Sequence, residues 1–390
     1  MSLISPRFVE RKWRQSAAAL TCGTLHFSAP NGEVTIFRGE EPGPHADLTV
    51  RHWDVIRLAA SRGDIGLGEA YIDAMWESSD IETLIALFLR NMERFESLAN
   101  GNLLQRIGFV LQNMLLRRNS LQGAARNIQA HYDVGNDFYA LWLDPSMTYS
   151  SALYGACDQD LERAQRAKYE RILSRLEGRG TSILEIGCGW GGFAERAADA
   201  SHRVTGLTLS PAQHRYASTR LSGRNADLRL QDYRLVRGTF DNIVSIEMFE
   251  AVGERYWPGY FHVLAERLKR GGRAVIQTIT VRDEIFADYR RRSDFIRHYV
   301  FPGGMLPSRA RFGQEAERAG LRILDVFPFG HDYARTLRAW SVRMQDAQDA
   351  IQSLGHDARF FRNWQFYLGM CAAAFAVGRT DVIQVELAHA

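Results

Sequence analysis

The hydrophobic and polar positions change their period along the chain. Between residues 22 and 57, apolar and polar side chains alternate around a Pro-Asn-Gly turn, which predicts short antiparallel strands. From residue 63 to residue 95 apolar positions recur at helical spacing, and the Ser-Ser-Asp sequence at 78–80 predicts a helix start. Together these patterns predict a small α+β domain over residues 1–100.

Strand and helix patterns alternate from about residue 160 onward. Apolar runs predict strands at 182–188, 203–209, 227–232, 241–250 and 273–281, with a later one at 321–327. Helices are expected in the gaps, at 162–177, 190–200, 211–221 and 257–269. This alternation favours a parallel sheet with right-handed crossovers. We therefore predict an α/β domain over residues 131–390, joined to the first domain by a basic, partly helical connector at 101–130.

Length and composition narrow the class of protein. A chain of 390 residues is longer than one hydrophobic core usually serves, which agrees with two domains. The four cysteines show no CxxC spacing and the eleven histidines no paired-ligand spacing, so we expect neither a disulfide framework nor a metal site, and a reducing cytoplasm. No window approaches about 18 uncharged apolar residues, so a soluble or peripheral membrane protein is expected.

A glycine-rich turn follows the first strand of the predicted parallel sheet. Gly187, Gly189, Gly191 and Gly192 lie between this strand and a helix, where free backbone N–H groups can receive a polar ligand. Their spacing differs from the G-x-G-x-x-G fingerprint of dinucleotide enzymes. With Glu185 before it, the segment is similar to the first motif of Rossmann-like methyltransferases that bind S-adenosylmethionine. Polar residues at the carboxyl ends of the next strands are expected at the same edge: Thr208, Gln213, Asp232 and Glu250.

Six ordered segments extend this likeness over nearly the whole chain. They are residues 131–154, 184–198, 206–213, 247–261, 301–308 and 331–340, and together they resemble cyclopropane fatty acid synthases. The resemblance implies a Rossmann-like class I methyltransferase domain with helical lipid-covering insertions and a smaller N-terminal domain that presents or senses lipid. It also implies an enzyme that moves a methyl group from S-adenosylmethionine onto a cis double bond of an acyl chain in membrane phospholipid, giving a cyclopropane fatty acid.

The same resemblance implies roles for individual residues. Those matched to positions around the cofactor are Tyr132, Tyr149, Ser150, Gly187, Gly189, Thr208, Gln213, Asp232 and Tyr233. Those matched to positions that hold a bicarbonate ion, which would accept a proton, are Glu250, Ile279 and Tyr333.

Three residues around this presumed bicarbonate pocket depart from the family pattern. Ser151 stands where a cysteine is typical, Gln277 where a histidine is typical, and Glu247 where a glycine is common. A second carboxylate near Glu250 repels an anion, or one of the two holds a proton with a raised pKa. Our hypothesis is that Glu247 supplants or repositions the bicarbonate as base. One alternative is that bicarbonate still binds, since Ser151 is a conservative replacement and Gln277 can still donate a hydrogen bond. Another is an ordinary ion pair of Glu247, for example with Arg255.

The expected chemistry requires aromatic side chains and a dry site. An isolated alkene is a weak nucleophile, so the site must align it with the methyl donor and then tolerate a carbocation. Aromatic faces stabilise positive charge without a lone pair that would trap it. Candidates are Tyr139, Trp142, Phe249, Tyr299, Phe301 and Tyr333.

Basic and aromatic residues interleave at 7–15 and 288–301, and the connector adds Arg117, Arg118 and Arg126. These segments predict peripheral contact with the anionic inner face of a membrane, although a solvated helix face is the ordinary alternative. A homodimer is a further possible assembly.

Other functions stay open at this point. The methyl transfer could end in a methylene branch, which a partner reductase would convert to a methyl branch. A small-molecule methyltransferase would share the glycine turn, and a catalytically silent lipid-binding protein could keep the fold. A nucleic-acid partner is not expected, because strand four lacks the Asn/Asp-Pro-Pro-aromatic signature used to hold an extruded base.

Overall fold

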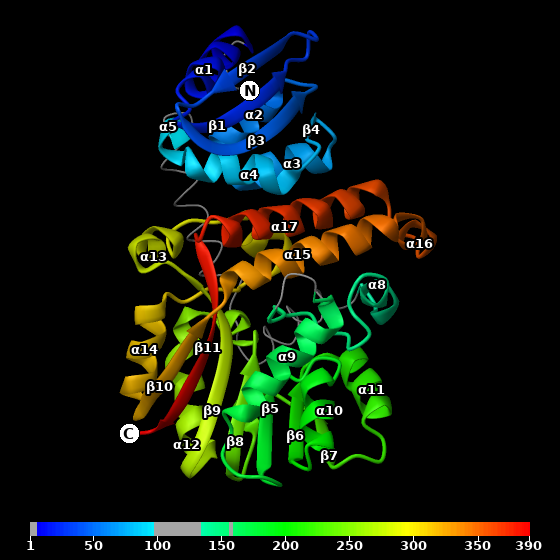
Figure 1. Ribbon diagram of the computed structural model, residues 1–390, viewed down its shortest axis with the longest axis vertical. Helices are drawn as coiled ribbons and strands as arrows, with labels where there is room; N and C mark the ends of the chain where they lie inside the picture. Colours follow the sequence, from blue (N-terminus) through cyan, green and yellow to red (C-terminus); the bar gives the residue numbers. More distant parts are fainter. Residues whose placement is uncertain (1–5, 97–133, 156–158) are drawn as a thin grey trace.

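The computed structural model describes residues 6–96, 134–155 and 159–390 (Figure 1). The N-terminal unit contains a four-stranded sheet in the order β2-β1-β3-β4. Its elements are α1 (Pro6–Ala18), β1 (Cys22–Ser28), β2 (Val34–Arg38), β3 (Glu41–Val50), α2 (Asp54–Arg62), α3 (Asp64–Ile72), β4 (Trp76–Glu77), α4 (Ile81–Arg90) and α5 (Met92–Glu96). The predicted connector at 101–130, with Arg117, Arg118 and Arg126, lies outside the described residues.

The expected antiparallel pairing is found between β1 and β2 and between β3 and β4. It is wrong for β1 and β3, which are parallel, because the chain crosses the amino end of β1 on its way from β2 to β3. Gly39 permits this close passage, since a Cβ there would lie 2.5 Å from the Cys22 nitrogen. The predicted strand also ends earlier, at Val50, and residues 54–57 begin α2. The predicted helix start near 78–80 is correct, because the Asp80 side chain accepts a hydrogen bond from the Thr83 N–H and caps α4.

The second sheet has seven strands in the order β10-β11-β9-β8-β5-β6-β7. All six predicted strands are present, as β5 (Ser182–Ile186), β6 (Arg203–Thr208), β7 (Ala226–Leu230), β8 (Phe240–Ile246), β9 (Leu268–Val281) and β10 (Leu321–Pro328). β5 to β9 are parallel, as expected, whereas β11 (Thr380–His389) runs antiparallel to both of its neighbours and was not predicted. The fold is the Rossmann-like mixed sheet of class I methyltransferases.

The four expected helices between these strands are α9 (Leu161–Ser174), α10 (Gly192–Asp199), α11 (Pro211–Arg220) and α12 (Trp257–Arg267). The other described helical elements after residue 134 are α8 (Asn136–Ala140), η1 (Tyr233–Leu235), η2 (Phe249–Ala251), η3 (Glu254–Tyr256), α13 (Asp283–Tyr289), η4 (Ile296–Val300), α14 (Arg309–Arg318), α15 (Gly330–Asp346), α16 (Gln348–Ser353) and α17 (Ala358–Ala376).

The helix pair α15 and α17 lies between the two sheets (Figure 1). α17 packs against α3 and α4 of the N-terminal unit. Gly68 of α3 allows the closest approach, because a Cβ there would lie 2.5 Å from the Phe295 ring and 2.7 Å from the Phe366 ring. Ion pairs also cross this interface: Arg338 with Glu82, Arg359 with Asp73, and Arg362 with Glu77 at 3.1 Å. Apolar packing thus continues from the N-terminal unit into helices α15 and α17.

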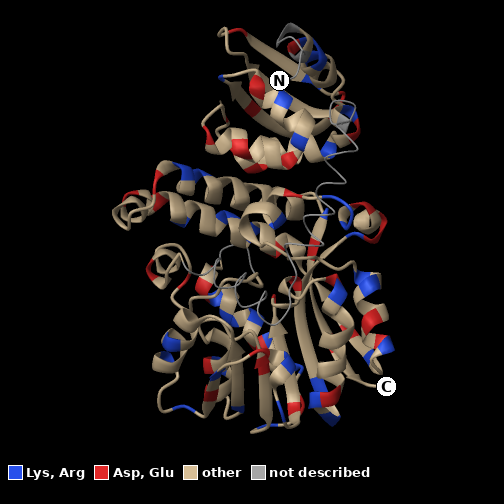
Figure 2. Cartoon of the chain, turned by 180° about the vertical axis from the view of Figure 1, so that it is seen from behind, with Lys and Arg blue, Asp and Glu red and all other residues tan. Residues whose placement is uncertain are grey.

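Charged positions are mixed over the surface. Figure 2 shows basic and acidic residues interspersed along the coloured helices and strands. The two segments expected to meet a membrane are partly engaged within the protein: Arg14 pairs with Glu10 and Glu33, and Arg297 is buried against Asp294. Among the helices that the structure describes, none is both long enough and apolar enough to cross a bilayer.

Candidate active site

A cavity of about 1560 Å³ lies at the carboxyl ends of the parallel strands. Its lining is mainly apolar and continues from the glycine turn to Val55, Ile56 and Phe88 of the N-terminal unit. Pockets for one drug-sized ligand usually measure about 300–1,000 Å³. The cavity therefore has room for a cofactor and an apolar chain together.

The glycine turn borders the cavity at the end of β5. Gly187, Gly189 and Gly191 have φ values of 86°, 51° and 85°, a region that favours glycine. A Cβ at Gly187 would lie 2.8 Å from the Met248 side chain, so this position must lack one. A Cβ at Gly189 would meet no atom within 4 Å, which leaves the backbone open to a ligand. Both the turn and the space beside it fit S-adenosylmethionine.

The other residues expected around the cofactor also line the cavity, except Tyr132, which lies outside the described residues. They are Tyr149, Ser150, Thr208, Gln213, Asp232 and Tyr233. Thr208 donates a 3.0 Å hydrogen bond to Gln213, so these two side chains form one neutral polar group beside the cofactor space. The Asp232 carboxylate pairs with Arg234 at 2.6 Å.

A buried lysine, which the sequence analysis missed, supports this wall of the cavity. The ammonium of Lys168 donates 2.7 Å hydrogen bonds to the hydroxyl of Ser150 and to the side chain of Gln165. Burial lowers the pKa of Lys168 to about 7, against the opposing effect of Glu247. Burial also raises the pKa of Glu185 to about 8, and its Oε2 has no partner among the described residues. The available clue was a lysine on the apolar face of α9, between Ala164 and Ile172.

Glu247 is the centre of a hydrogen-bond cluster at the end of β8. Its Oε1 accepts from the Ser151 N–H at 2.8 Å and from the Gln277 amide at 2.7 Å, and its Oε2 accepts from the Tyr333 hydroxyl at 2.6 Å. Its φ of 50° is uncommon for a residue other than glycine. Such strain, which costs about 1–3 kcal/mol, persists where the surroundings hold the residue in place.

Glu250 lies three residues after Glu247, in η2. Its Oε1 accepts from the Ile279 N–H at 2.5 Å and from the Thr278 hydroxyl at 3.0 Å, while Oε2 has no partner among the described residues. Burial, and then the charge of Glu247, raise the pKa of Glu250 to about 8. Burial also raises the pKa of Glu247, but Tyr333, Lys168, Ser151 and Gln277 oppose that rise. We infer that Glu247 carries the negative charge and Glu250 a proton at neutral pH.

This arrangement does not fit a bicarbonate ion. The donors around the presumed bicarbonate pocket already bind carboxylates of the chain: Ser151, Gln277 and Tyr333 bind Glu247, and Ile279 binds Glu250. A further anion beside the charged Glu247 carboxylate would be repelled. The alternative ion pair of Glu247 with Arg255 is also absent from the described contacts, because the hydrogen-bond partners of Glu247 are neutral groups.

The aromatic residues divide between the cavity and the core. Of the six candidates, Phe301 and Tyr333 line the cavity. Tyr139 and Trp142 pack in an aromatic cluster, and Phe249 stacks on Trp257 at 5.4 Å. Tyr299 is 42% exposed and donates to Glu69, so these four expectations were wrong.

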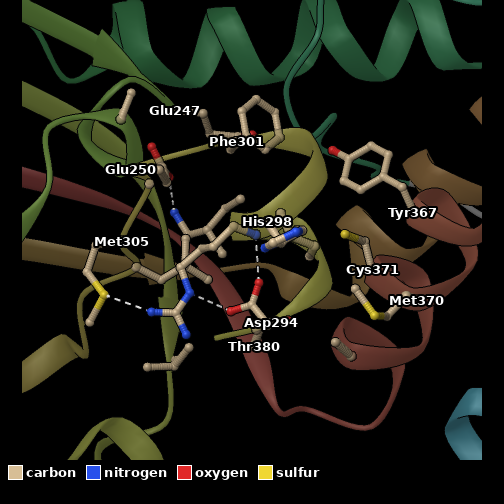
Figure 3. A pocket seen from close by; sticks show the side chains of 18 of the residues that line it. Glu247, Glu250, Asp294, His298, Phe301, Met305, Tyr367, Met370, Cys371 and Thr380 are labelled. Carbon is tan, nitrogen blue, oxygen red and sulfur yellow. Dashed lines mark hydrogen bonds and ion pairs between the residues drawn. The ribbon is translucent and has the colours of Figure 1, made fainter. Parts of the chain in front are cut away.

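Helix α17 supplies an aromatic wall that was not predicted. Tyr367 accepts a 3.0 Å hydrogen bond from the Tyr149 hydroxyl and lines the cavity beside Phe366. Figure 3 shows Glu247, Glu250 and Phe301 on one side of the cavity and Tyr367, Met370 and Cys371 on the other.

Comparisons with known proteins agree with this site. A family model described as mycolic acid cyclopropane synthetase matches residues 119–385. The chain is 35% identical over 345 residues to the tuberculostearic acid methyltransferase of Mycobacterium tuberculosis, covering 85% of this chain and 80% of that protein. It is 34% identical over 345 residues to the cyclopropane-fatty-acyl-phospholipid synthase of Escherichia coli K12, covering 87% of each.

A solved structure of a mycolic acid cyclopropane synthase complexed with SAH and CTAB matches with a TM-score of 0.64. The two are 32% identical, and the match covers 67% of this chain and 97% of that one. The glycine turn, the polar residues at the strand ends and the large apolar cavity are thus parts of an S-adenosylmethionine-dependent methyltransferase that acts on an unsaturated lipid. The chain belongs to the mycolic acid cyclopropane synthetase family.

Proposed function

We propose that this protein transfers a methyl group from S-adenosylmethionine to the cis double bond of an acyl chain in a membrane phospholipid and closes a cyclopropane ring. The observation that carries the proposal is the Glu247 carboxylate, which borders a mainly apolar cavity and is held by Ser151, Gln277 and Tyr333. A fixed carboxylate is a suitable base for the proton that ring closure must release.

The cofactor, when bound, supplies an electrophilic methyl group on a positively charged sulfur. The residues of the chain hold the alkene against it and exclude water. Transfer of this methyl group would use the π electrons of the double bond for the new carbon–carbon bond, would leave the electrons of the broken sulfur–carbon bond on sulfur, and would make the other alkene carbon positive. Phe301 and Tyr367 present aromatic rings on two sides of this space. Such rings stabilise a cation without adding to it.

Glu247 then takes one proton from the transferred methyl group. Its Oε2 accepts a single described hydrogen bond, from Tyr333, so one lone pair is left on that atom. The electrons of the broken C–H bond close the ring onto the positive carbon. Glu250, holding its own proton, does not compete for this one.

The product distinguishes this proposal from the methylene alternative. The experiment incubates purified protein with methyl-labelled S-adenosylmethionine and phospholipid vesicles that contain cis-monounsaturated chains, and then analyses the chains by mass spectrometry before and after mild hydrogenation. A ring keeps its mass on hydrogenation, whereas a methylene branch gains two hydrogens. Labelled chains of unchanged mass support the proposal. A gain of two hydrogens, or no label in the lipid, contradicts it.

A further inference from the structure

The cavity opens to solvent at one rim in the part of the chain that the structure describes. The exposed residues in its lining belong to two short segments, Arg62–Gly63 at the end of α2, and 288–292 at the end of α13 and directly after it. The two segments are neighbours, because the Phe295 N–H donates a 3.1 Å hydrogen bond to the carboxylate of Asp64. A long substrate therefore enters between the N-terminal unit and the segment after α13.

The exposed side chains of this rim are mainly basic. Arg291 and Arg292 line the cavity, are exposed, and form no ion pair with any described residue. Arg62 also lines the rim but is paired with Glu69. Asp288 is the exposed acid there, so the unpaired arginines outnumber it by two to one. The rim thus favours an anionic group on the substrate.

Two buried hydroxyl groups in the lining also lack a partner. Ser293 follows the two arginines, and its Oγ is buried without a hydrogen-bond partner among the described residues. The same is true of the Thr380 hydroxyl. Figure 3 shows Thr380 on the same side of the cavity as Asp294, next in sequence to Ser293. An unpaired buried hydroxyl is unfavourable, and an oxyanion that accepts from it removes that cost.

We propose that Arg291, Arg292 and Ser293 form a subsite for the phosphodiester of a diacylphospholipid substrate. Arginine forms paired hydrogen bonds to phosphate oxygens, and the serine hydroxyl adds one more donor. With the phosphodiester at the rim, the acyl chain runs inward past Phe301 and Tyr367 toward the base. The inference rests on the proposed function and adds that the headgroup is held by specific contacts rather than by the general charge of a membrane.

The test compares two substrates with the same acyl chains in nonionic detergent micelles, where no charged bilayer is present. One is dioleoyl phosphatidylglycerol and the other is dioleoylglycerol, which lacks the phosphate. Replacing both arginines (R291Q/R292Q) should raise KM for the phospholipid about tenfold or more, since each exposed guanidinium–phosphate contact contributes roughly threefold or more and the two factors multiply. The KM for dioleoylglycerol and for S-adenosylmethionine should stay within about twofold.

Two further variants make the result specific. Ser293→Ala removes a buried hydroxyl without a described partner, so it should leave the melting temperature of the ligand-free protein equal or slightly higher while raising KM for the phospholipid alone by roughly threefold. The matched control is R237Q/R270Q, which removes two exposed arginines at the amino ends of β8 and β9, away from the rim, and should have no effect.

Several outcomes overturn the proposal. Equal losses on both lipids would show a structural effect, and a loss that appears with anionic vesicles but not with micelles would show general docking. Activity only on an acyl chain attached to a carrier protein would assign the rim to another substrate. If the wild-type protein methylates neither lipid in micelles nor phospholipid in vesicles, the proposed function itself fails.

Discussion

The side-chain amide of Gln277 donates a 2.7 Å hydrogen bond to the carboxylate of Glu247. The side-chain oxygen of Gln277 in turn accepts a 3.0 Å hydrogen bond from the side-chain amide of Gln384 in β11, and this bond fixes the orientation of the Gln277 amide. The Gln277 amide carries no charge, so it stabilises the negative charge of Glu247 as a neutral hydrogen-bond donor. The buried cation that also stabilises this charge is Lys168. A carboxylate in this setting keeps its ability to accept a proton.

Glu247→Gln should lower kcat by about 100-fold or more, because it removes a base of the kind that contributes 10²–10⁴-fold to catalysis. The affinity for S-adenosylmethionine, measured by calorimetry, should change by less than about threefold, since the glycine turn is untouched. A drop in cofactor affinity equal to the loss of activity would instead show that the site had rearranged.

Glu247→Gly provides a sharper control on the same point. It frees the Ser151, Gln277 and Tyr333 donors and leaves room for a small anion, so added bicarbonate should restore part of its activity. The wild-type protein should be indifferent to bicarbonate in a depleted buffer. Stimulation of the wild type would contradict the assignment of Glu247 as the base.

Glu250 should make the protein less stable as pH rises. Its pKa is raised from 4.5 to about 8 by burial and by Glu247, so between these values the folded state binds more protons than the unfolded state. Stability contributed by the protonated form is complete below pH 4.5 and is lost as pH increases to about 8. The melting temperature of Glu250→Gln should therefore increase relative to that of the wild type as the pH is raised from 5 to 8.5. A constant difference would mean that the Glu250 pKa is not raised.

The parallel strands and the residues at their ends could be predicted because buried parallel strands are continuous apolar runs whose carboxyl ends meet at one edge. Thr208, Gln213 and Asp232 reach the same cavity for that reason. The aromatic wall could not be predicted in this way, since a tyrosine in a core has the same local pattern as one facing a cavity. Tyr139 was therefore misplaced and Tyr367 missed.

The state of Glu247 also depends on distant parts of the chain. Its donors come from residue 151, from β9 and from α15, and no local pattern indicates that these three positions meet. The departures from the family pattern indicated the pocket. Only the fold shows that the Glu247 carboxylate accepts hydrogen bonds from these three donors. β11 was missed because its apolar run follows a long helix rather than a strand–helix alternation.

Lys168 should act on cofactor binding through Ser150. Loss of its proton as pH rises through about 7 removes a positive charge behind the Ser150 hydroxyl, so the wild-type KM for S-adenosylmethionine should rise over that range. Lys168→Met should have a high KM that no longer depends on pH. In a double-mutant cycle with Ser150→Ala the two changes should not add, because they interrupt one contact. Additive effects would place Lys168 in a purely structural role.

Tyr367 should contribute through its ring rather than its hydroxyl. Its hydroxyl accepts from Tyr149, and the residue lines the cavity in which the proposed positive charge develops. Tyr367→Leu should lower kcat by about tenfold, in line with a cation–π contribution of about 0.5–2 kcal/mol, with little change in KM for the lipid. Tyr367→Phe keeps the ring and should retain most of the activity. Single-turnover measurements separate this step from product release, and equal losses in the two variants would assign the role to the hydrogen bond with Tyr149 instead.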